Sequence, residues 1–236
     1  MNNKYFLLII SLGFLIIGTH HTIEAATTTT RTTNEGNPKA NAMLLNACRN
    51  GNLKATQDAI NDEANINTSD KDGITPLMYA CLGGNPEVVT LLLSNDADVH
   101  KADKFGDTPI SWASSFYENP EIVKILLTHG ADANECDKFG NTPLMGACRR
   151  RNSEIVKLLL ESGAKVSWNL NDNDKKFVQM VLARKDWTPL MHACANENTD
   201  IVDALLKSGA NPNTENTKNV ANPSLKNRAN SYDLYD

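Results

Sequence analysis

Residues 139–164 of the chain read Phe-Gly-Asn-Thr-Pro-Leu-Met-Gly-Ala-Cys-Arg-Arg-Arg-Asn-Ser-Glu-Ile-Val-Lys-Leu-Leu-Leu-Glu-Ser-Gly-Ala. Thr142 is a favourable N-cap, and Pro143 stands at the first helical position, where a helix tolerates proline. A short helix is therefore expected after Thr142. A second helix is expected from about Ser153, because its aliphatic residues recur with helical periodicity. Gly163 is placed to end that helix in a left-handed conformation.

The same pattern occurs elsewhere in the chain. Thr-Pro recurs at Thr75, Thr108, Thr142 and Thr188, at intervals of 33, 34 and 46 residues. Each Thr-Pro is followed by a second apolar segment, at 87–93, 121–127, 154–160 and 200–206. A period near 33 residues with Thr-Pro-Leu at the helix start resembles the ankyrin repeat. The resemblance implies an all-α repeat solenoid, a stack of helix-turn-helix repeats joined by β-hairpin-like fingers.

The phase of the repeats divides the chain into segments. The repeat domain is expected at 40–215, with a capping repeat at about 40–69 whose helices lie at 42–49 and 53–61. Full repeats are expected at 73–102, 106–136, 140–169 and 186–215. The Thr-rich residues 26–39 and the Asn-rich residues 216–236 are expected to be a disordered linker and tail. Tyr232, Leu234 and Tyr235 in that tail are either a docking peptide or part of a frayed end.

An insertion at 167–185 makes one repeat interval longer than the others. Val166, Trp168 and Leu170 alternate with polar residues, and so do Val178, Met180 and Leu182. Strict alternation favours an extended β-hairpin, and a short helix over 176–184 is the alternative.

The first 25 residues have the features of a secretory signal peptide. Lys4 is followed by an apolar run from Tyr5 to Gly18, which is short for a membrane span, and Ala25 offers a cleavage site. The chain is therefore expected to be exported, to a periplasm or outside the cell. An uncleaved anchor is the alternative, and it is the only membrane association expected.

Composition and side-chain placement argue against several classes of function. The formal net charge of −5 disfavours nucleic acid and anionic membranes as partners. His100, His129 and His192 fall in different repeats, with no Ser or Cys nucleophile placed beside them. Neither a Cys/His metal-binding spacing nor a glycine-rich phosphate loop is present in the sequence. We therefore expect no enzyme activity, no cofactor, no metal and no small-molecule substrate.

The five cysteines are expected to be reduced. Four of them occupy one equivalent position in the first helices, where neighbouring helices are too far apart for a disulfide. These four are expected to be buried apolar residues, and the fifth, in a predicted turn, to be accessible. The four are Cys48, Cys81, Cys148 and Cys194, and the fifth is Cys136.

The joints between repeats carry Asp-Lys-x-Gly at 70–73, 103–106 and 137–140. Asp bonds its own backbone two residues on and Gly adopts a positive φ, so these joints are predicted to be fingers that project from the helices. At the position after Thr-Pro-Leu, the ankyrin pattern usually has His, but this chain has Met78, Ser111, Met145 and Met191.

The remaining function is recognition of a protein. In ankyrin-like stacks, fingers and first helices form one concave face to which proteins bind, and many of this chain's aromatic residues map there. Aromatic residues and Arg dominate binding hot spots. The residues expected to contact a partner are Lys71, Tyr79, Lys104, Phe105, Asp107, Trp112, Phe116, Tyr117, Lys138, Phe139, Asn141, Arg149, Arg150, Trp168, Trp187 and His192.

Alternatives remain open for some of these residues and for the function. Phe105 and Phe139 are also consistent with packing of one finger against the next. Trp112 is also consistent with partial burial, and residues 149–151 are also consistent with a solvated turn. The sequence thus predicts a monomeric, exported module that binds an unidentified protein. The alternative is a structural or chaperone-like protector of a periplasmic enzyme.

Overall fold

The computed structural model describes residues 35–116, 119–166 and 188–212. These residues form helix pairs without any β-strand among them. The pairs are α1 (Pro38–Arg49) with α2 (Leu53–Asn61), α3 (Pro76–Gly83) with α4 (Pro86–Leu93), α5 (Pro109–Ser115) with α6 (Pro120–Thr128), α7 (Pro143–Arg150) with α8 (Ser153–Glu161), and α10 (Pro189–Ala195) with α11 (Thr199–Lys207).

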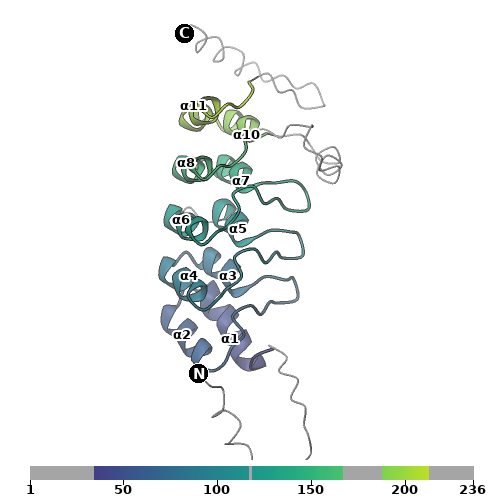
Figure 1. Cartoon of the computed structure of the whole chain (residues 1–236), viewed down its shortest axis with the longest axis vertical. Coiled ribbons are helices and arrows are strands. Elements are labelled where there is room, and N and C mark those ends of the chain that lie inside the picture. The colour runs from purple at the N-terminus through teal and green to yellow at the C-terminus, as the bar shows by residue number, and fades with distance from the viewer. Residues whose placement is uncertain (1–34, 117–118, 167–187, 213–236) are drawn as a thin grey trace, which may run out of the picture. The chain divides into compact units, whose positions relative to one another are not determined.

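The pairs stack in chain order as two layers of helices. Each first helix contacts the next first helix, from α1 through α3, α5 and α7 to α10, and each second helix contacts the next second helix. Figure 1 shows the first helices lying between the second helices and the projecting loops. The all-α solenoid predicted from the sequence is confirmed.

Local sequence explains where each helix begins. The hydroxyl groups of Thr75, Thr142 and Thr188 accept a hydrogen bond from the N–H three residues on, at 3.2, 3.3 and 3.2 Å. Thr108 makes no such bond, and its Oγ1 lies 3.4 Å from Ser111 Oγ. At the Thr75 cap, the sulfur of Met78 accepts a bond from the Thr75 N–H.

The second helices each begin after an asparagine, and some of these caps also join the layers. Asn85 accepts the N–H of Glu87, and its Nδ2 donates to the Gly51 carbonyl of the preceding pair at 2.9 Å. Asn119 donates to the Gly84 carbonyl in the same way, at 3.2 Å. One side chain therefore starts a helix and sets the spacing to its neighbour.

The core is a continuous column of aliphatic side chains between the two layers. Ala80, Ala113, Ala147 and Ala193 are almost fully buried, as their equivalent positions predict, and they allow the first helices to approach closely. Large side chains fill the space between layers, including Leu77, Leu92, Ile110, Leu126, Leu144, Leu159, Leu190 and Ile201.

Two details differ from the sequence-based expectation. The first helix begins at Pro38 rather than at residue 42, because Asn37 caps it by accepting the Lys39 N–H, so the predicted linker at 26–39 overlaps the fold. Cys194 is only partly buried, unlike Cys48, Cys81 and Cys148. No described helix pair follows the pair that contains Cys194, which explains its exposure. Burial raises the pKa of the Cys48 thiol to about 12.

Several sequence-based expectations concern residues outside the described part of the chain. They are the signal peptide at 1–25, the insertion at 167–185 with its hairpin or helix, and the tail at 216–236. Within the described residues, no helix is both long and apolar enough to cross a membrane.

Candidate functional site

Three fingers project from one side of the first helices, and each is held by one aspartate. Asp103 Oδ1 accepts the N–H groups of Phe105 and Asp107, at 2.8 and 3.0 Å. Asp70 and Asp137 make the same pair of bonds in their fingers. Gly106 has φ of 88°, a conformation that favours glycine. The predicted Asp-x-x-Gly turns are therefore confirmed.

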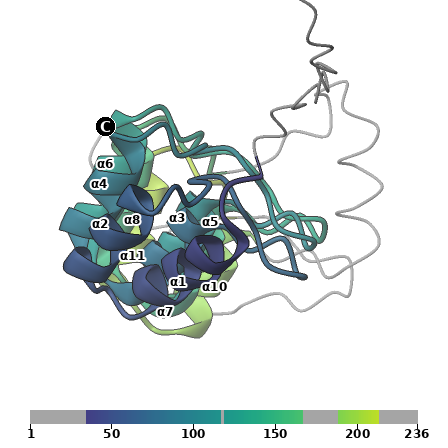
Figure 2. The ribbon, with the colours of Figure 1, turned by 90° about the horizontal axis from the view of Figure 1, so that it is seen from below.

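The fingers are also bonded to one another. The Lys104 N–H donates to the Asp72 carbonyl at 2.9 Å, and the Lys138 N–H donates to the Phe105 carbonyl at 2.8 Å. The side chains add a Lys104–Asp72 ion pair at 2.5 Å and a bond from Lys138 Nζ to the Lys104 carbonyl at 2.6 Å. Seen along the stack, the fingers project in one direction (Figure 2). They form a bonded row with a fixed relative position.

Beside the fingers, one side chain of α3, one of α5 and the C-cap residue of α5 form an aromatic column, defined here as Tyr79, Trp112 and Phe116. Tyr79 and Trp112 occupy the same position of successive repeats, and their rings meet edge-on with centroids 6.5 Å apart. The Trp112 and Phe116 rings are 5.0 Å apart. The Arg49 guanidinium lies 5.7 Å from the centroid of the Tyr79 ring, at cation–π distance.

The column is attached to the fingers by hydrogen bonds. The Tyr79 hydroxyl donates to Asp70 Oδ2 at 2.8 Å, and Trp112 Nε1 donates to Asp103 Oδ2 at 3.3 Å. The same aspartates hold the finger turns, so each orients both a turn and an aromatic ring.

The following repeats break this arrangement. Gly146 occupies the position of Tyr79 and Trp112, where an added Cβ would overlap Ser115 Oγ. The free oxygen of the finger aspartate, Asp137 Oδ2, instead accepts Asn141 Nδ2 at 2.6 Å. His192 holds the position one repeat further on. Burial, together with the charge of Arg149, lowers the pKa of His192 to about 4, so it is neutral at pH 7.

Most of the residues predicted to contact a partner lie on this surface, which we call the finger face: the three fingers and the first helices. Phe105, Phe116 and Phe139 have 46%, 51% and 40% of their surface exposed. Trp112 is half-buried, which agrees with the partial burial given as its alternative. The exposed members are Lys71, Lys104, Phe105, Phe116, Lys138, Phe139, Arg149 and Arg150; the half-buried ones are Tyr79, Asp107, Trp112, Asn141 and His192.

Some predicted residues fall elsewhere, and one was missed. Tyr117, Trp168 and Trp187 lie outside the described residues. Arg149 and Arg150 belong to the last turn of α7 rather than to the solvated turn considered as the alternative, and Arg150 Nε donates to the Ser115 carbonyl at 2.5 Å. Arg49, which the sequence analysis did not single out, also lies beside the column; it follows Cys48 as Arg149 follows Cys148, and this correspondence is visible in the sequence.

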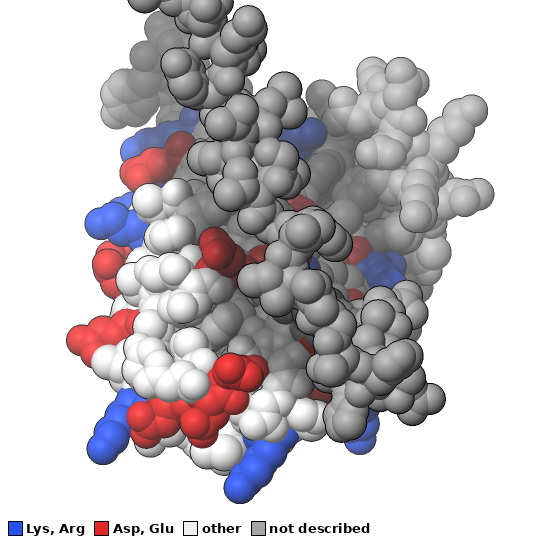
Figure 3. Space-filling view, turned by 60° about the horizontal axis from the view of Figure 1, so that its bottom comes forward, with Lys and Arg blue, Asp and Glu red and all other residues white. Residues whose placement is uncertain are grey.

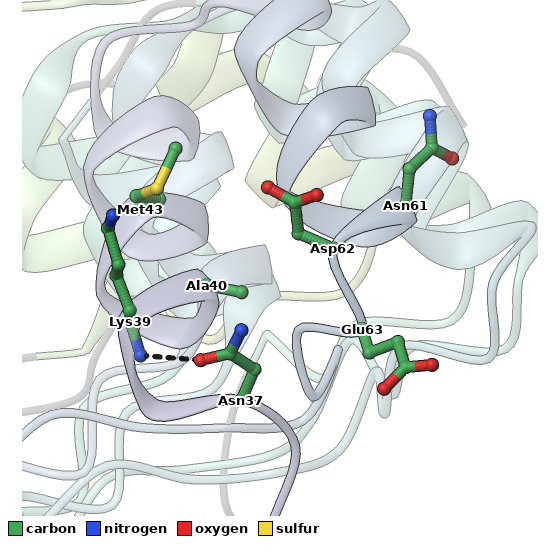
Figure 4. Close-up of a pocket in the computed structure, with 7 residues that line it drawn as sticks. All are labelled: Asn37, Lys39, Ala40, Met43, Asn61, Asp62 and Glu63. Carbon is green, nitrogen blue, oxygen red and sulfur yellow. Dashed lines mark hydrogen bonds between the residues drawn. The ribbon is translucent and has the colours of Figure 1, made fainter.

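A hollow of about 480 Å³ lies at the α1–α2 end of the stack, lined by residues of α1 and of the end of α2. Figure 4 shows its lining, in which the Lys39 N–H donates to Asn37 Oδ1. The face at this end carries acidic side chains beside an uncharged area (Figure 3). In the part of the chain that the structure describes, no group of three or more His, Cys, Asp or Glu residues could hold a metal ion.

The repeated geometry agrees with a comparison against known families. The family described as ankyrin repeats (3 copies) matches residues 18–103, 44–135 and 110–216, most of the chain. The chain belongs to the ankyrin-repeat family. Ankyrin repeats are generally protein–protein interaction modules, and they are typically not enzymes. No curated protein matches this ankyrin-repeat chain.

Proposed function

We propose that this ankyrin-repeat protein is exported and binds a protein partner through its finger face. The observation that carries the proposal is the aromatic column beside the bonded row of fingers. Phe116 is half-exposed at one end of the column, and Phe105 and Phe139 are exposed at the finger tips. Exposed aromatic rings on a rigid support lose little conformational entropy on binding, and aromatic residues are enriched in hot spots.

The structure gives physical reasons for this face rather than the opposite one. The rings of the column contact one another, and Tyr79 and Trp112 are also bonded to Asp70 and Asp103, so the surface is preorganised. The described large hydrophobic side chains that are exposed are Met43, Leu53, Phe105, Phe116 and Phe139, and the three Phe all lie on the finger face.

The test is capture of a partner by the full chain and by matched variants. Trp112→Ala with Phe116→Ala should reduce the captured partner about tenfold or more, as expected for hot-spot residues. The control pair, Glu121→Ala with Lys124→Ala, changes exposed residues of α6 and should leave capture unchanged. Phe105→Ala, at an exposed finger tip, provides a variant that leaves the helix packing intact.

The opposite result would contradict the proposal. If the α6 variants abolish capture and the column and Phe105 variants do not, the binding surface lies on the second helices. Broad, weak binding of many unrelated proteins, unaffected by the column variants, would instead favour the chaperone-like alternative.

Export is a separate part of the proposal and has its own test. It is supported by Lys4, the apolar run from Tyr5 to Gly18 and the small residue Ala25. N-terminal sequencing of protein recovered outside the cytoplasm should start at about residue 26. Protein that retains Met1 and stays in membranes would indicate an anchor, and protein found only in the cytoplasm would contradict export.

A further inference from the structure

Charge is distributed unequally between the two layers of this protein. Among the described residues of the fingers and the first helices, every charged side chain that is exposed is Lys or Arg. They are Lys39, Arg49, Lys71, Lys104, Lys138, Arg149 and Arg150. The whole chain, in contrast, has a formal net charge of −5. The basic character of the finger face therefore opposes the overall charge.

The acidic residues of the same face make hydrogen bonds or an ion pair within the fingers. Asp103 and Asp137 are buried and accept the finger N–H groups, and Asp70 makes the same bonds while half-buried. Asp72 is paired with Lys104. Burial and the neighbouring Asp137 and Asp103 raise the pKa of Asp107 to about 6, so this half-buried carboxyl is still mostly ionised at pH 7. The charged side chains that are exposed on this face are therefore basic, while its carboxylates are buried or half-buried and bonded within the fingers.

The second helices have a mixed surface. Their exposed charged residues are Lys54, Asp58, Glu87, Glu121, Lys124, Glu154, Lys157, Glu161, Asp200 and Lys207. The loops after them add exposed acidic residues at Asp62, Glu63, Asp96, Asp98 and Asp132. An acidic ligand approaching the molecule is therefore attracted more strongly to the exposed Lys and Arg of the finger face than to the mixed surface of the second helices.

The basic side chains surround the aromatic residues. Arg49 lies against Tyr79 at one end of the column, and Arg150 donates to the Ser115 carbonyl next to Phe116 at the other. At a finger tip, Lys104 Nζ lies 4.9 Å from the centroid of the Phe105 ring. Such a surface matches a segment in which carboxylates and apolar side chains are interspersed.

We infer that the partner presents an acidic segment, rich in Asp or Glu and carrying aromatic or aliphatic side chains, to the finger face. This inference rests on the proposed function and specifies the chemistry of its partner. The apolar side chains contact the aromatic column and the Phe residues of the fingers. The carboxylates pair with the exposed Lys and Arg, which supply orientation and association rate more than affinity.

The test uses a short labelled peptide in which Asp and Glu alternate with Phe and Leu. Its controls are one peptide with Lys in place of the acidic residues and one with Ser in place of the apolar residues. The full chain should bind the acidic apolar peptide, with affinity falling as NaCl is raised, and should bind both controls at least about tenfold more weakly.

Charge reversal locates the binding surface. Lys71→Glu with Arg149→Glu should weaken binding about tenfold or more. Lys124→Glu with Lys157→Glu, on α6 and α8, makes the same change in net charge and should alter binding less than about twofold. Thermal melting of each variant shows that the fold is retained.

Several outcomes would overturn the inference. Equal binding of the Lys peptide, or equal effects of the two charge reversals, means that the face does not select acidic segments. If a chain lacking 213–236 binds the peptide more tightly than the full chain does, the tail competes for the finger face. The occupant of that face is then the chain's own acidic and aromatic segment Tyr232–Asp236. Self-association that is lost on reversal of Lys71 and Arg149 assigns it to a second copy. If captured partners need the aromatic column but bind through basic segments, the proposed function stands and this inference fails.

Discussion

The ionised form of Asp107 is disfavoured in the folded protein. Its pKa is raised to about 6 by burial and by Asp137 and Asp103, against a value of 3.8 for an unperturbed aspartate. Between these pH values, the folded protein holds a proton that the unfolded chain has released. The contribution of Asp107 to stability is therefore present below pH 4 and is lost as pH rises through 6.

We expect Asp107→Asn to stabilise the protein at pH 7. Asn141 occupies the equivalent position in the next finger and donates to Asp137, which shows that an amide fits there. The gain should be about 1 kcal/mol once solvent screening of a half-buried group is allowed for, and it should disappear near pH 4. Denaturant unfolding at a series of pH values measures it. A gain that is constant with pH would show that Asp107 is not the titrating group.

His192 titrates in an overlapping range with the opposite sign. Its pKa is lowered to about 4 by burial and by Arg149, so the unfolded chain binds a proton that the folded protein does not. Its contribution to stability is present above pH 6.5 and is lost as pH falls towards 4. The pH dependences of stability that come from Asp107 and His192 partly cancel in the unaltered protein. The effect of Asp107 is therefore measured as the difference in free energy of unfolding between the unaltered protein and Asp107→Asn at each pH.

Gly83 shows how closely the first helices approach one another. A Cβ added to Gly83 would overlap the backbone carbonyl of Cys48 and lie 2.8 Å from the Gly51 nitrogen. Gly83→Ala should therefore destabilise by about 1–3 kcal/mol, although alanine has the higher helix propensity. Gly146→Ala is the comparison, because it meets mainly the Ser115 side chain, which can rotate, and should cost less. Similar melting temperatures for the two variants would contradict this packing.

At the scale of the element, an asparagine side chain bonds the loops of successive repeats at two of three equivalent positions, and a histidine stands at the third. Asn67 Nδ2 donates to the Asp96 carbonyl at 2.9 Å and its Oδ1 accepts the Asp98 N–H at 2.7 Å. Asn134 bridges to Gly163 and Lys165 in the same way. His100 stands at the equivalent position of the middle joint and lies 3.8 Å from Glu135 instead.

We expect His100→Asn to strengthen that middle joint. The new amide could bond the Gly130 carbonyl and the Asp132 N–H, the groups equivalent to those that Asn67 and Asn134 bond. Two added hydrogen bonds, less the lost contact with Glu135, should raise the free energy of unfolding by about 1 kcal/mol. Asn134→His is the reverse change and should lower it. A destabilised His100→Asn would mean that the pairing with Glu135 contributes more than the two amide bonds.

The repeat pattern predicted most elements because the chemistry of helix starts is local. Thr before Pro, Asn before the second helix and Asp-x-x-Gly in each finger act through bonds within a few residues. Contacts between repeats were harder to predict. The contact between the Tyr79 and Trp112 rings and the position of Arg49 over Tyr79 depend on the lateral offset between layers, which the sequence does not state.

At the scale of the whole molecule, the stack holds the finger face and the second-helix surface on opposite sides of one core. The central claim is that a protein partner covers the finger face. Hydrogen–deuterium exchange of the full chain, alone and with a captured partner, tests it most directly. The claim predicts new protection of the fingers at 70–74, 103–107 and 137–141 and of the exposed turns of α3, α5 and α7, with α4, α6 and α8 unchanged. Protection confined to α4, α6 and α8 would contradict it.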